Sequence, residues 1–277
     1  MDAGYEPELA RAVQLADLAD EITMRHYLAR TLSVETKPDN TPVTQADLEV
    51  EQALSEVVTA QFGDAYVGEE GVRQEGAERC WIVDPIDGTK NYLRGMPVWG
   101  TLIALSDDSG PLAAVVSSPA LNRRWWATRG GGAWTRDAWG PQRQLAVSKV
   151  ARLADAFILY GSLFSWDRTS MHSYRILALL KEAWRHRSVG DFLGHLLVAE
   201  GAADICVEPD LRRWDIEAPA LIVAEAGGAV WQSRDSTDDP GLPRIVVTSN
   251  GAFGREILAR PGLEERSRSG SVLVSGT

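Results

Sequence analysis

The stretch of sequence that best indicates the fold is Trp81-Ile82-Val83-Asp84-Pro85-Ile86-Asp87-Gly88-Thr89-Lys90-Asn91. Its apolar start predicts a buried strand that stops at Asp84. The carboxylates of Asp84 and Asp87 then follow three residues apart. Two anions this close repel each other unless a cation lies between them. Together with the Ile86 carbonyl they form a set of hard oxygen ligands, which suits Mg²⁺ better than Zn²⁺.

The residues after this strand favour a phosphate ligand. Gly88 lets the backbone approach a ligand closely. The N–H groups of Gly88 and Thr89 open the next turn, where they can hold phosphate oxygens. The stretch therefore predicts a Mg²⁺–phosphate site at a strand–helix junction. A capped turn is the alternative, because Asp, Pro and Gly are common turn residues, and the stretch alone does not decide between the two.

Two further segments carry acidic residues in a similar setting. Val67-Gly68-Glu69-Glu70-Gly71 places paired carboxylates after a short apolar run, and Trp214-Asp215-Ile216-Glu217 places an Asp at the start of a helical pattern. The structural alternative for Asp215 is a helix N-terminal acid that is favoured by the helix dipole. Taken in order, G-E-E, D-P-I-D-G-T, W-D and the later E-A-G-G at 225–228 resemble the inositol monophosphatase family of Mg²⁺-dependent, lithium-sensitive phosphatases. The resemblance runs from about Leu9 to about Leu258.

This resemblance implies two or three Mg²⁺ ions per site. One ion, which activates water, would be held by Glu69, Asp84 and the Ile86 carbonyl. A second would be held by Asp84, Asp87 and Asp215. A pair of metal ions can activate water, neutralise the charge that spreads over the phosphoryl group and stabilise the leaving alkoxide.

The resemblance also assigns residues around the metals. Glu70 and Thr89 would position the attacking water, with Thr89 as proton relay. Asp47 ends Thr44-Gln45-Ala46-Asp47, which is close to a capping box and predicts a structural role; by resemblance Asp47 also faces the metal cluster. Lys37 would lie at the rim of the entrance. Contacts to phosphate and substrate would come from Asp87, Gly88, Thr89, Asn91, Arg187, Asp191 and Glu208.

Two acidic residues in the second half of the chain bear on the substrate. By resemblance Glu208 contacts the alcohol part of the substrate, and Asp191 departs from the small or hydroxyl residue expected in relatives selective for inositol. Two acids suit a cationic alcohol, because charge-assisted hydrogen bonds are strong. The alternative for Asp191 is a cap of the helix that follows. Including 96–99, 123–126 and 190–193, the chain is similar to the actinobacterial histidinol-phosphate phosphatases of this family.

The predicted function is therefore Mg²⁺-dependent hydrolysis of histidinol phosphate to histidinol and phosphate. Inositol-1-monophosphatase and broader sugar or nucleotide phosphomonoesterase activities are alternatives within the family. A regulatory interaction protein is an alternative of another class, because some bacterial members also bind transcription machinery. The complete set of predicted metal ligands argues against a loss of catalysis.

Composition limits the remaining possibilities. The chain has 277 residues, of which 44% are apolar, and a net charge of −11. This charge disfavours nucleic acid as a partner. No apolar run approaches the roughly 18 residues of a membrane span, and the acidic N-terminus lacks the features of a signal peptide. We expect a soluble cytoplasmic protein whose partner is a small phosphate monoester, and the resemblance implies a homodimer. Cys80 and Cys206 lie in apolar runs and are expected to be buried thiols.

Strands that alternate with helices predict a layered α/β (α+β) fold, and the resemblance implies the αβαβα sandwich of the inositol monophosphatase and fructose bisphosphatase type. We expect an N-terminal half, 1–150, with most metal ligands, a C-terminal half, 151–262, with the substrate wall and Asp215, and a disordered tail, 263–277. Helices are expected at 8–29, 44–62, 168–183, 190–200, 215–226 and 253–259. Strands are expected to end at Asp84 and to cover 97–105, 112–118, 123–127, 156–160, 185–189, 203–207 and 245–248, with a further turn and strand at 130–134.

Overall fold

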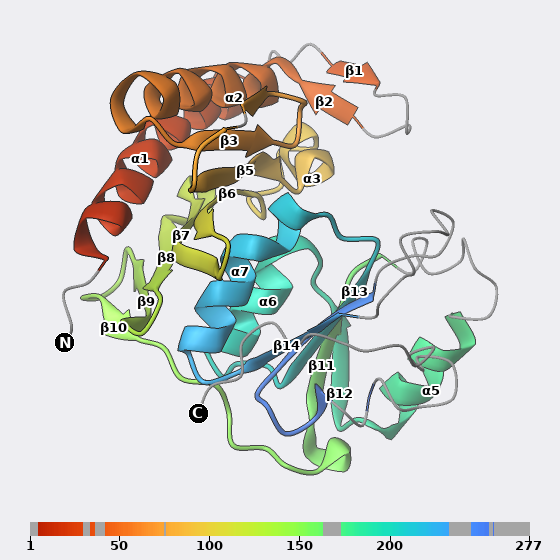
Figure 1. Ribbon diagram of the computed structural model, residues 1–277. Coiled ribbons are helices and arrows are strands. Elements are labelled where there is room, and N and C mark those ends of the chain that lie inside the picture. Colours follow the sequence, from red (N-terminus) through yellow and green to blue (C-terminus); the bar gives the residue numbers. More distant parts are fainter. Residues whose placement is uncertain are drawn as a thin grey trace.

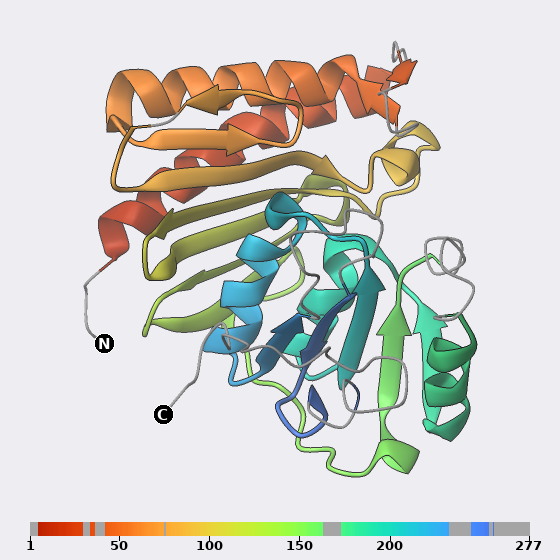
Figure 2. The ribbon, with the colours of Figure 1, turned by 45° about the vertical axis from the view of Figure 1, so that its right-hand side comes forward.

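A computed structural model describes residues 5–29, 34–36, 42–74, 76–162, 173–232, 245–254 and 257. Helices and sheets alternate in layers across the molecule (Figure 1). Helices α1 and α2 cover one face of an eight-stranded sheet, α6 and α7 lie between this sheet and a five-stranded sheet, and α5 covers the far face (Figure 2). The predicted αβαβα sandwich is confirmed.

The first layer consists of α1 (Glu6–Ala29) and α2 (Gln45–Val57), and α2 continues as a π-helical turn, Val58–Phe62. The predicted capping box is confirmed, because the Thr44 side chain accepts from the Asp47 N–H while the Asp47 carboxylate accepts from the Thr44 N–H at 2.8 Å. This reciprocal pair satisfies donors that a helix start leaves unbonded. It therefore explains why the second helix begins where it does.

The large sheet has the strand order β10-β9-β8-β7-β6-β5-β3-β4. Strands β5 to β10 are joined by antiparallel pairing, and β3 lies parallel to β5. Besides it, the first half holds a small β1–β2 pair and the short helix α3. The bounds are β1 Val34–Thr36, β2 Pro42–Thr44, β3 Ala65–Gly68, β4 Arg73–Gln74, β5 Cys80–Asp87, α3 Thr89–Leu93, β6 Gly100–Asp107, β7 Gly110–Ser118, β8 Arg123–Thr128, β9 Gly132–Asp137 and β10 Arg143–Gln144.

The large sheet is apolar on both faces because it is covered on both faces. Successive side chains of a strand point to opposite sides, and β6 follows this rule. Leu102 and Ala104 pack into the core shared with α6 and α7, whereas Ile103 and Leu105 pack into the core shared with α1 and α2. Burial on both sides therefore explains the continuous apolar run in this strand.

The second sheet has the order β12-β11-β13-β15-β14, with β11 parallel to both β12 and β13 and with antiparallel pairing elsewhere. Ile205 and Val207 of β13 pack towards α5, while Cys206 between them packs towards α6. The bounds are β11 Phe157–Tyr160, α5 Ser173–Glu182, β12 Arg185–Ser188, α6 Asp191–Ala199, β13 Ile205–Pro209, α7 Arg213–Glu225, β14 Ala229–Gln232 and β15 Ile245–Ser249.

One sequence prediction about the central strand is wrong. The strand does not stop at Asp84, because β5 continues to Asp87, which pairs with Gly100 of β6. The register shifts between Asp84 and Asp87, and the Thr101 hydroxyl donates to the Pro85 carbonyl at 2.8 Å. Pro85 has no N–H to donate to the ladder, and this irregularity sets the last residues of β5 apart from the regular strand. Strands β1 to β4, β10 and β14 were not predicted.

Several sequence predictions fall on residues that lie outside the described part of the chain. These are Lys37, most of the 36–42 loop, the start of the helix expected at 168–183, most of the helix expected at 253–259, and the tail at 263–277. No helix in the described ranges is both long and apolar enough to cross a membrane.

We predict that Leu54→Ala lowers the free energy of unfolding by about 2–5 kcal/mol, as expected for a buried leucine. Leu54 is 0% exposed in the core between α1, α2 and the large sheet. Leu48 lies on the same helix and is 44% exposed, so Leu48→Ala is the matched control with an expected cost below about 1 kcal/mol. Urea unfolding measures both values, and equal losses would contradict the layer assignment of α2.

Candidate active site

Three of the predicted metal ligands meet where β5 ends and α7 begins. Carboxylate oxygens of Asp84, Asp87 and Asp215 lie within 4.8 Å of one another. Asp84 and Asp87 come from the irregular end of β5, and Asp215 comes from the first turn of α7 in the other half of the chain. The fold therefore brings together carboxylates that are far apart in the sequence.

Asp84 lies deepest in this group, with 1% of its surface exposed. Burial raises the pKa of Asp84 well above its usual value, and the negative charges of Glu69, Asp87 and Asp215 raise it further. A hydrogen bond links the Glu69 and Asp84 side chains, while Asp84 Oδ1 is buried with no hydrogen-bond partner. A buried carboxylate oxygen without a donor is costly unless a cation binds it. This oxygen-only donor set therefore fits Mg²⁺.

Asp87 connects the two halves of the chain. Its Oδ2 accepts a hydrogen bond from the backbone N–H of Phe192 at 2.5 Å, in the first turn of α6. Burial raises the pKa of Asp87 well above its usual value, and the charges of Asp191 and Asp215 add to this effect. The positive end of the α6 dipole offsets part of that repulsion.

The sequence left open whether Asp215 is an acid at the start of a helix or a member of the acidic site, and the structure places it in both positions. Its Oδ2 accepts from the backbone N–H of Arg212 at 2.6 Å, so it caps α7. The same side chain lies among the carboxylates, where burial raises its pKa to about 7. One oxygen thus caps the helix, and the carboxylate still faces the cluster.

The turn after β5 has the conformation that its residues predict. Gly88 adopts φ +83°, and a Cβ there would lie 3.1 Å from the Val98 carbonyl and 3.3 Å from Asp191 Oδ2. Only glycine fits this position without strain. The Thr89 hydroxyl donates to the Ile86 carbonyl at 3.1 Å, which places both predicted functional groups at one point of the turn.

Asp191 does not cap the helix that follows it. The N-cap of α6 is Gly190, without a side-chain hydrogen bond, and Asp191 itself has φ +59°. Its carboxylate turns to the first half of the chain, where Oδ2 accepts from Asn91 Nδ2 at 3.0 Å. Asn91 also donates to the Val98 carbonyl at 2.8 Å, so it fixes Asp191 beside the turn at Gly88. The helix-cap alternative is therefore wrong.

Glu208 lies beside Asp191. It belongs to β13, is 5% exposed, and accepts a hydrogen bond from the Asp191 backbone. Burial raises the pKa of Glu208 well above its usual value, with further contributions from the charges of Asp191 and Asp215. A Cβ at Gly161 would lie 3.0 Å from Glu208 Oε1, so this glycine leaves room for the carboxylate. Asp191 and Glu208 thus form an acidic wall next to the predicted metal ligands.

The remaining predicted residues are placed as follows. Asp47 is fully buried in the α2 cap, and Glu70 directly follows Glu69 in the turn after β3. Arg187 lies on the exposed strand β12, where its guanidinium donates to the His186 carbonyl at 2.8 Å. The catalytic and substrate roles of these residues remain predictions.

Glu51 is a site residue that the sequence analysis missed. It lies on α2, is 1% exposed, and accepts from the backbone N–H groups of Glu70 at 2.7 Å and Val72 at 2.6 Å. A Cβ at Gly68 would lie 2.3 Å from this carboxyl group. Glu51 therefore holds the turn that carries Glu69 and Glu70. The sequence feature that could have revealed Glu51 is an acidic residue on the apolar face of a helix, directly after the buried Val50.

Fold and site together define a layered α/β protein with a cluster of carboxylates, Asp84, Asp87 and Asp215, where β5 ends and α7 begins. A family model described as the inositol monophosphatase family matches residues 5–261, and the chain belongs to this family. The histidinol-phosphatase of Mycobacterium tuberculosis is 45% identical, covering 91% of this chain and 97% of that protein. The histidinol-phosphatase of Streptomyces coelicolor is 46% identical, covering 92% and 96%. The crystal structure of the extragenic suppressor protein SuhB of Bartonella henselae has a TM-score of 0.79 at 28% identity, covering 91% and 97%.

We predict that Asp215→Asn flattens the pH dependence of stability in the metal-free protein. The folded pKa of about 7 lies above the value of about 4 in an unfolded chain. Between these values the unfolded chain releases its proton first, so the Asp215 contribution to stability is lost as pH rises from about 4 to about 7. Asn cannot ionise. Relative to the parent, the free energy of unfolding of Asp215→Asn should therefore be higher at pH 8 than at pH 5 by on the order of 1–2 kcal/mol.

Denaturant unfolding in the presence of a chelator measures this difference. Asp155→Asn is the matched control, because Asp155 is an exposed partner of Arg152 on the surface. The slope of stability against pH should stay unchanged in that variant. If the free energy of unfolding of Asp215→Asn depended on pH as steeply as that of the parent, the pKa of Asp215 would not be raised in the folded protein.

Proposed function

We propose that this chain is a Mg²⁺-dependent phosphatase that hydrolyses histidinol phosphate to histidinol and phosphate. The observation that carries the proposal is the acidic wall of Asp191 and Glu208 beside the carboxylates that suit Mg²⁺. The names of the two actinobacterial relatives support it, since both are histidinol-phosphatases at 45–46% identity over more than nine-tenths of the chain.

The metal part of the proposal rests on the carboxylate cluster. Glu69, Asp84, the Ile86 carbonyl, Asp87 and Asp215 would hold two or three Mg²⁺ ions. When bound, these ions would lower the pKa of a water molecule, neutralise charge on the phosphoryl group and stabilise the leaving alkoxide. Burial and mutual repulsion raise the pKa values of Asp84, Asp87 and Asp215. These values support the assignment, because a divalent cation would stabilise the charged form of all three carboxylates.

The residues of the chain supply orientation and proton transfer. The Thr89 hydroxyl, which donates to the Ile86 carbonyl in the structure, would turn towards the attacking water and relay its proton, with Glu70 orienting that water. The Gly88 and Thr89 amides would bind phosphate oxygens. Glu51 would act as a positioning residue, because it holds the backbone of the turn that carries Glu69 and Glu70.

The wall of the site selects the alcohol. Histidinol carries an amine and an imidazole, and both can donate charge-assisted hydrogen bonds to carboxylates. Asp191 accepts a hydrogen bond from Asn91, close to the turn proposed to bind phosphate, whereas Glu208 lies on β13 of the small sheet. A neutral polyol would leave two buried acids without cationic partners, which is unfavourable. The same wall disfavours inositol phosphate as the main substrate.

We predict a higher kcat/KM for histidinol phosphate than for inositol 1-phosphate, and a selective effect of Asp191→Asn. Loss of one charge-assisted hydrogen bond should lower kcat/KM for histidinol phosphate by about 10- to 100-fold. The neutral substrate should lose much less. Asn accepts positive φ values, so the backbone at φ +59° is retained.

Asp155→Asn, far out on the surface, is the matched control and should leave both rates unchanged. Equal losses on both substrates in Asp191→Asn would show that Asp191 is a general structural element of the site. A parent enzyme that prefers inositol 1-phosphate would overturn the substrate and leave only the family assignment.

We further predict that Li⁺ at millimolar concentration inhibits Mg²⁺-dependent turnover. Li⁺ is a small hard cation with half the charge of Mg²⁺, so it would occupy a carboxylate site without giving the same stabilisation of the phosphoryl charge. A steady-state titration with NaCl at equal ionic strength is the control, since both salts screen charges alike. Equal effects of LiCl and NaCl would contradict the predicted metal arrangement. The predicted homodimer and cytoplasmic location remain predictions.

A further inference from the structure

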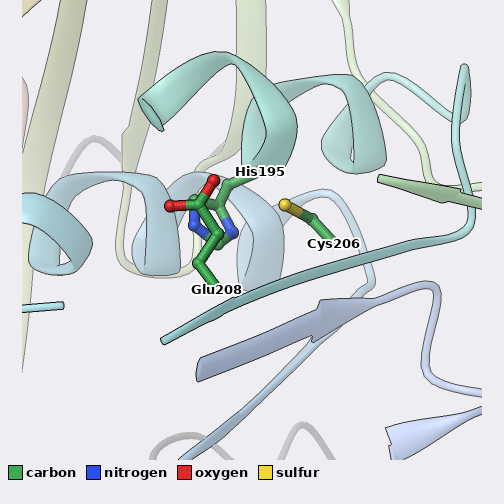
Figure 3. A group of neighbouring side chains, drawn as sticks. All are labelled: His195, Cys206 and Glu208. Atoms are coloured by element: carbon green, nitrogen blue, oxygen red, sulfur yellow. The ribbon is translucent and has the colours of Figure 1, made fainter. Parts of the chain in front are cut away.

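A second group of potential metal ligands lies behind the acidic wall, between α6 and the small sheet. Cys206 and Glu208 are two residues apart on β13, so their side chains lie on the same face of that strand, and His195 on α6 lies against them (Figure 3). One ligand atom from each residue lies within 4.8 Å of the other two. All three residues are buried, at 1%, 0% and 5% exposure for His195, Cys206 and Glu208.

Ordinary core packing does not satisfy the polar atoms of this group. His195 Nδ1 is hydrogen-bonded to the Thr248 hydroxyl at 2.8 Å, whereas His195 Nε2 is buried without a hydrogen bond. Glu208 Oε1 is also buried without a hydrogen bond. Buried polar atoms of native proteins nearly always have partners, and one without a partner destabilises the fold. Two such atoms beside one thiol therefore indicate a ligand.

The backbone is shaped to bring the thiol into the group. Gly194 precedes His195, and a Cβ at Gly194 would lie 2.6 Å from Cys206 Sγ. Helix α6 can therefore lie this close to Cys206 only because residue 194 is glycine. The hydroxyl of Thr248 on the neighbouring strand β15 fixes the histidine ring from the other side. Such a partner on one ring nitrogen is the usual way in which proteins orient a histidine that binds metal through the other.

We propose that His195, Cys206 and Glu208 form a Zn²⁺ site that is separate from the Asp84, Asp87 and Asp215 cluster. A nitrogen, a sulfur and an oxygen ligand form a borderline-soft donor set, which favours Zn²⁺, while the other cluster offers only oxygen and favours Mg²⁺. Zn²⁺ binds sulfur at about 2.3 Å and nitrogen at about 2.0–2.1 Å. Cys206 would lose its thiol proton to solvent, and the thiolate lone pair would form the Zn–S bond.

Binding at this site has a consequence for the acidic wall. Glu208 also accepts from the Asp191 backbone and is influenced by the charges of Asp191 and Asp215, so it faces the predicted active site as well as His195. If Glu208 bound Zn²⁺, its carboxylate would no longer be available in the acidic wall to bind the alcohol part of the substrate. Zn²⁺ would therefore inhibit by weakening the binding of a cationic alcohol, a consequence that rests on the proposed function.

The test is a Co²⁺ titration of the full-length protein, kept reduced and saturated with Mg²⁺. A thiolate bound to Co²⁺ gives an intense near-ultraviolet charge-transfer band, which oxygen ligands do not give, so the band reports Cys206 independently of turnover. We expect the band at one equivalent of Co²⁺, and we expect added Zn²⁺ to abolish it. The His195→Gln variant should need at least about tenfold more Co²⁺ for the same band.

Cys80 provides the matched control, because the chain has 2 cysteines and Cys80 packs elsewhere, at the start of β5. The band should persist in Cys80→Ser and in Asp87→Asn, and it should vanish in both Cys206→Ser and Cys206→Ala. Circular dichroism and thermal unfolding establish that each variant is folded. A band that survives in a folded Cys206 variant, is lost in Cys80→Ser, or is missing from the parent would overturn the proposal.

Enzyme kinetics then separate this site from the proposed function. At saturating Mg²⁺, Zn²⁺ should raise the KM for histidinol phosphate in the parent, and Cys206→Ala should require at least about tenfold more Zn²⁺ for the same effect. A Co²⁺ band without any turnover of histidinol phosphate would support the Zn²⁺ site and reject the substrate. Turnover of histidinol phosphate without a band would reject the Zn²⁺ site alone.

Discussion

Electrostatic repulsion between buried carboxylates is the constraint around which this molecule is built. The end of β5, the turn after β3 and the first turns of α6 and α7 all bring acidic side chains to one place. Burial raises the pKa of each of Asp84, Asp87 and Asp215, and the repulsion between neighbouring carboxylates raises it further. Among the described residues, Lys90 and Arg212 offset it only in part, through Asp191 and Asp215. Such a site is stable at neutral pH only when protons or cations balance the charge. A cation that binds this cluster in the folded protein, and not in the unfolded chain, would therefore stabilise the fold.

The layered architecture holds these repelling groups in place. Apolar packing on both faces of the large sheet fixes β5, and the middle layer fixes the N-termini of α6 and α7. Backbone N–H groups of those helix ends, at Phe192 and Arg212, then bind Asp87 and Asp215 directly. The buried carboxylate of Glu51 on α2 likewise accepts hydrogen bonds from backbone N–H groups of the turn at 70–72, and so fixes that turn. The rigidity of the site thus comes from the hydrophobic layers beneath it.

Much of this arrangement could be predicted from short-range patterns. The spacing of Asp84 and Asp87, the glycine at 88 and the cap at Thr44 and Asp47 each act through near neighbours, so the sequence reveals them. The position of Asp191 was ambiguous, because its role depends on φ +59° and on a partner, Asn91, that is distant in the chain. The same limit explains the errors and omissions.

The continuation of β5 beyond Asp84 depends on pairing with β6, and the role of Glu51 depends on a turn that folds against another helix. Likewise, His195 and Glu208 are joined only because α6 packs on β13. A pattern along one segment does not contain these tertiary contacts.

The order of the layers along the chain also affects how the protein is synthesised. Every strand of the large sheet lies between residues 65 and 144, so this sheet can form while α6 and α7 are still unsynthesised. Until those helices arrive, the face that carries Leu102, Val116 and Trp125 has no cover. A nascent chain at this stage exposes a broad apolar surface of the kind that chaperones bind and that drives aggregation. It also lacks Asp215, so the cluster of Asp84, Asp87 and Asp215 is incomplete until α7 has been synthesised.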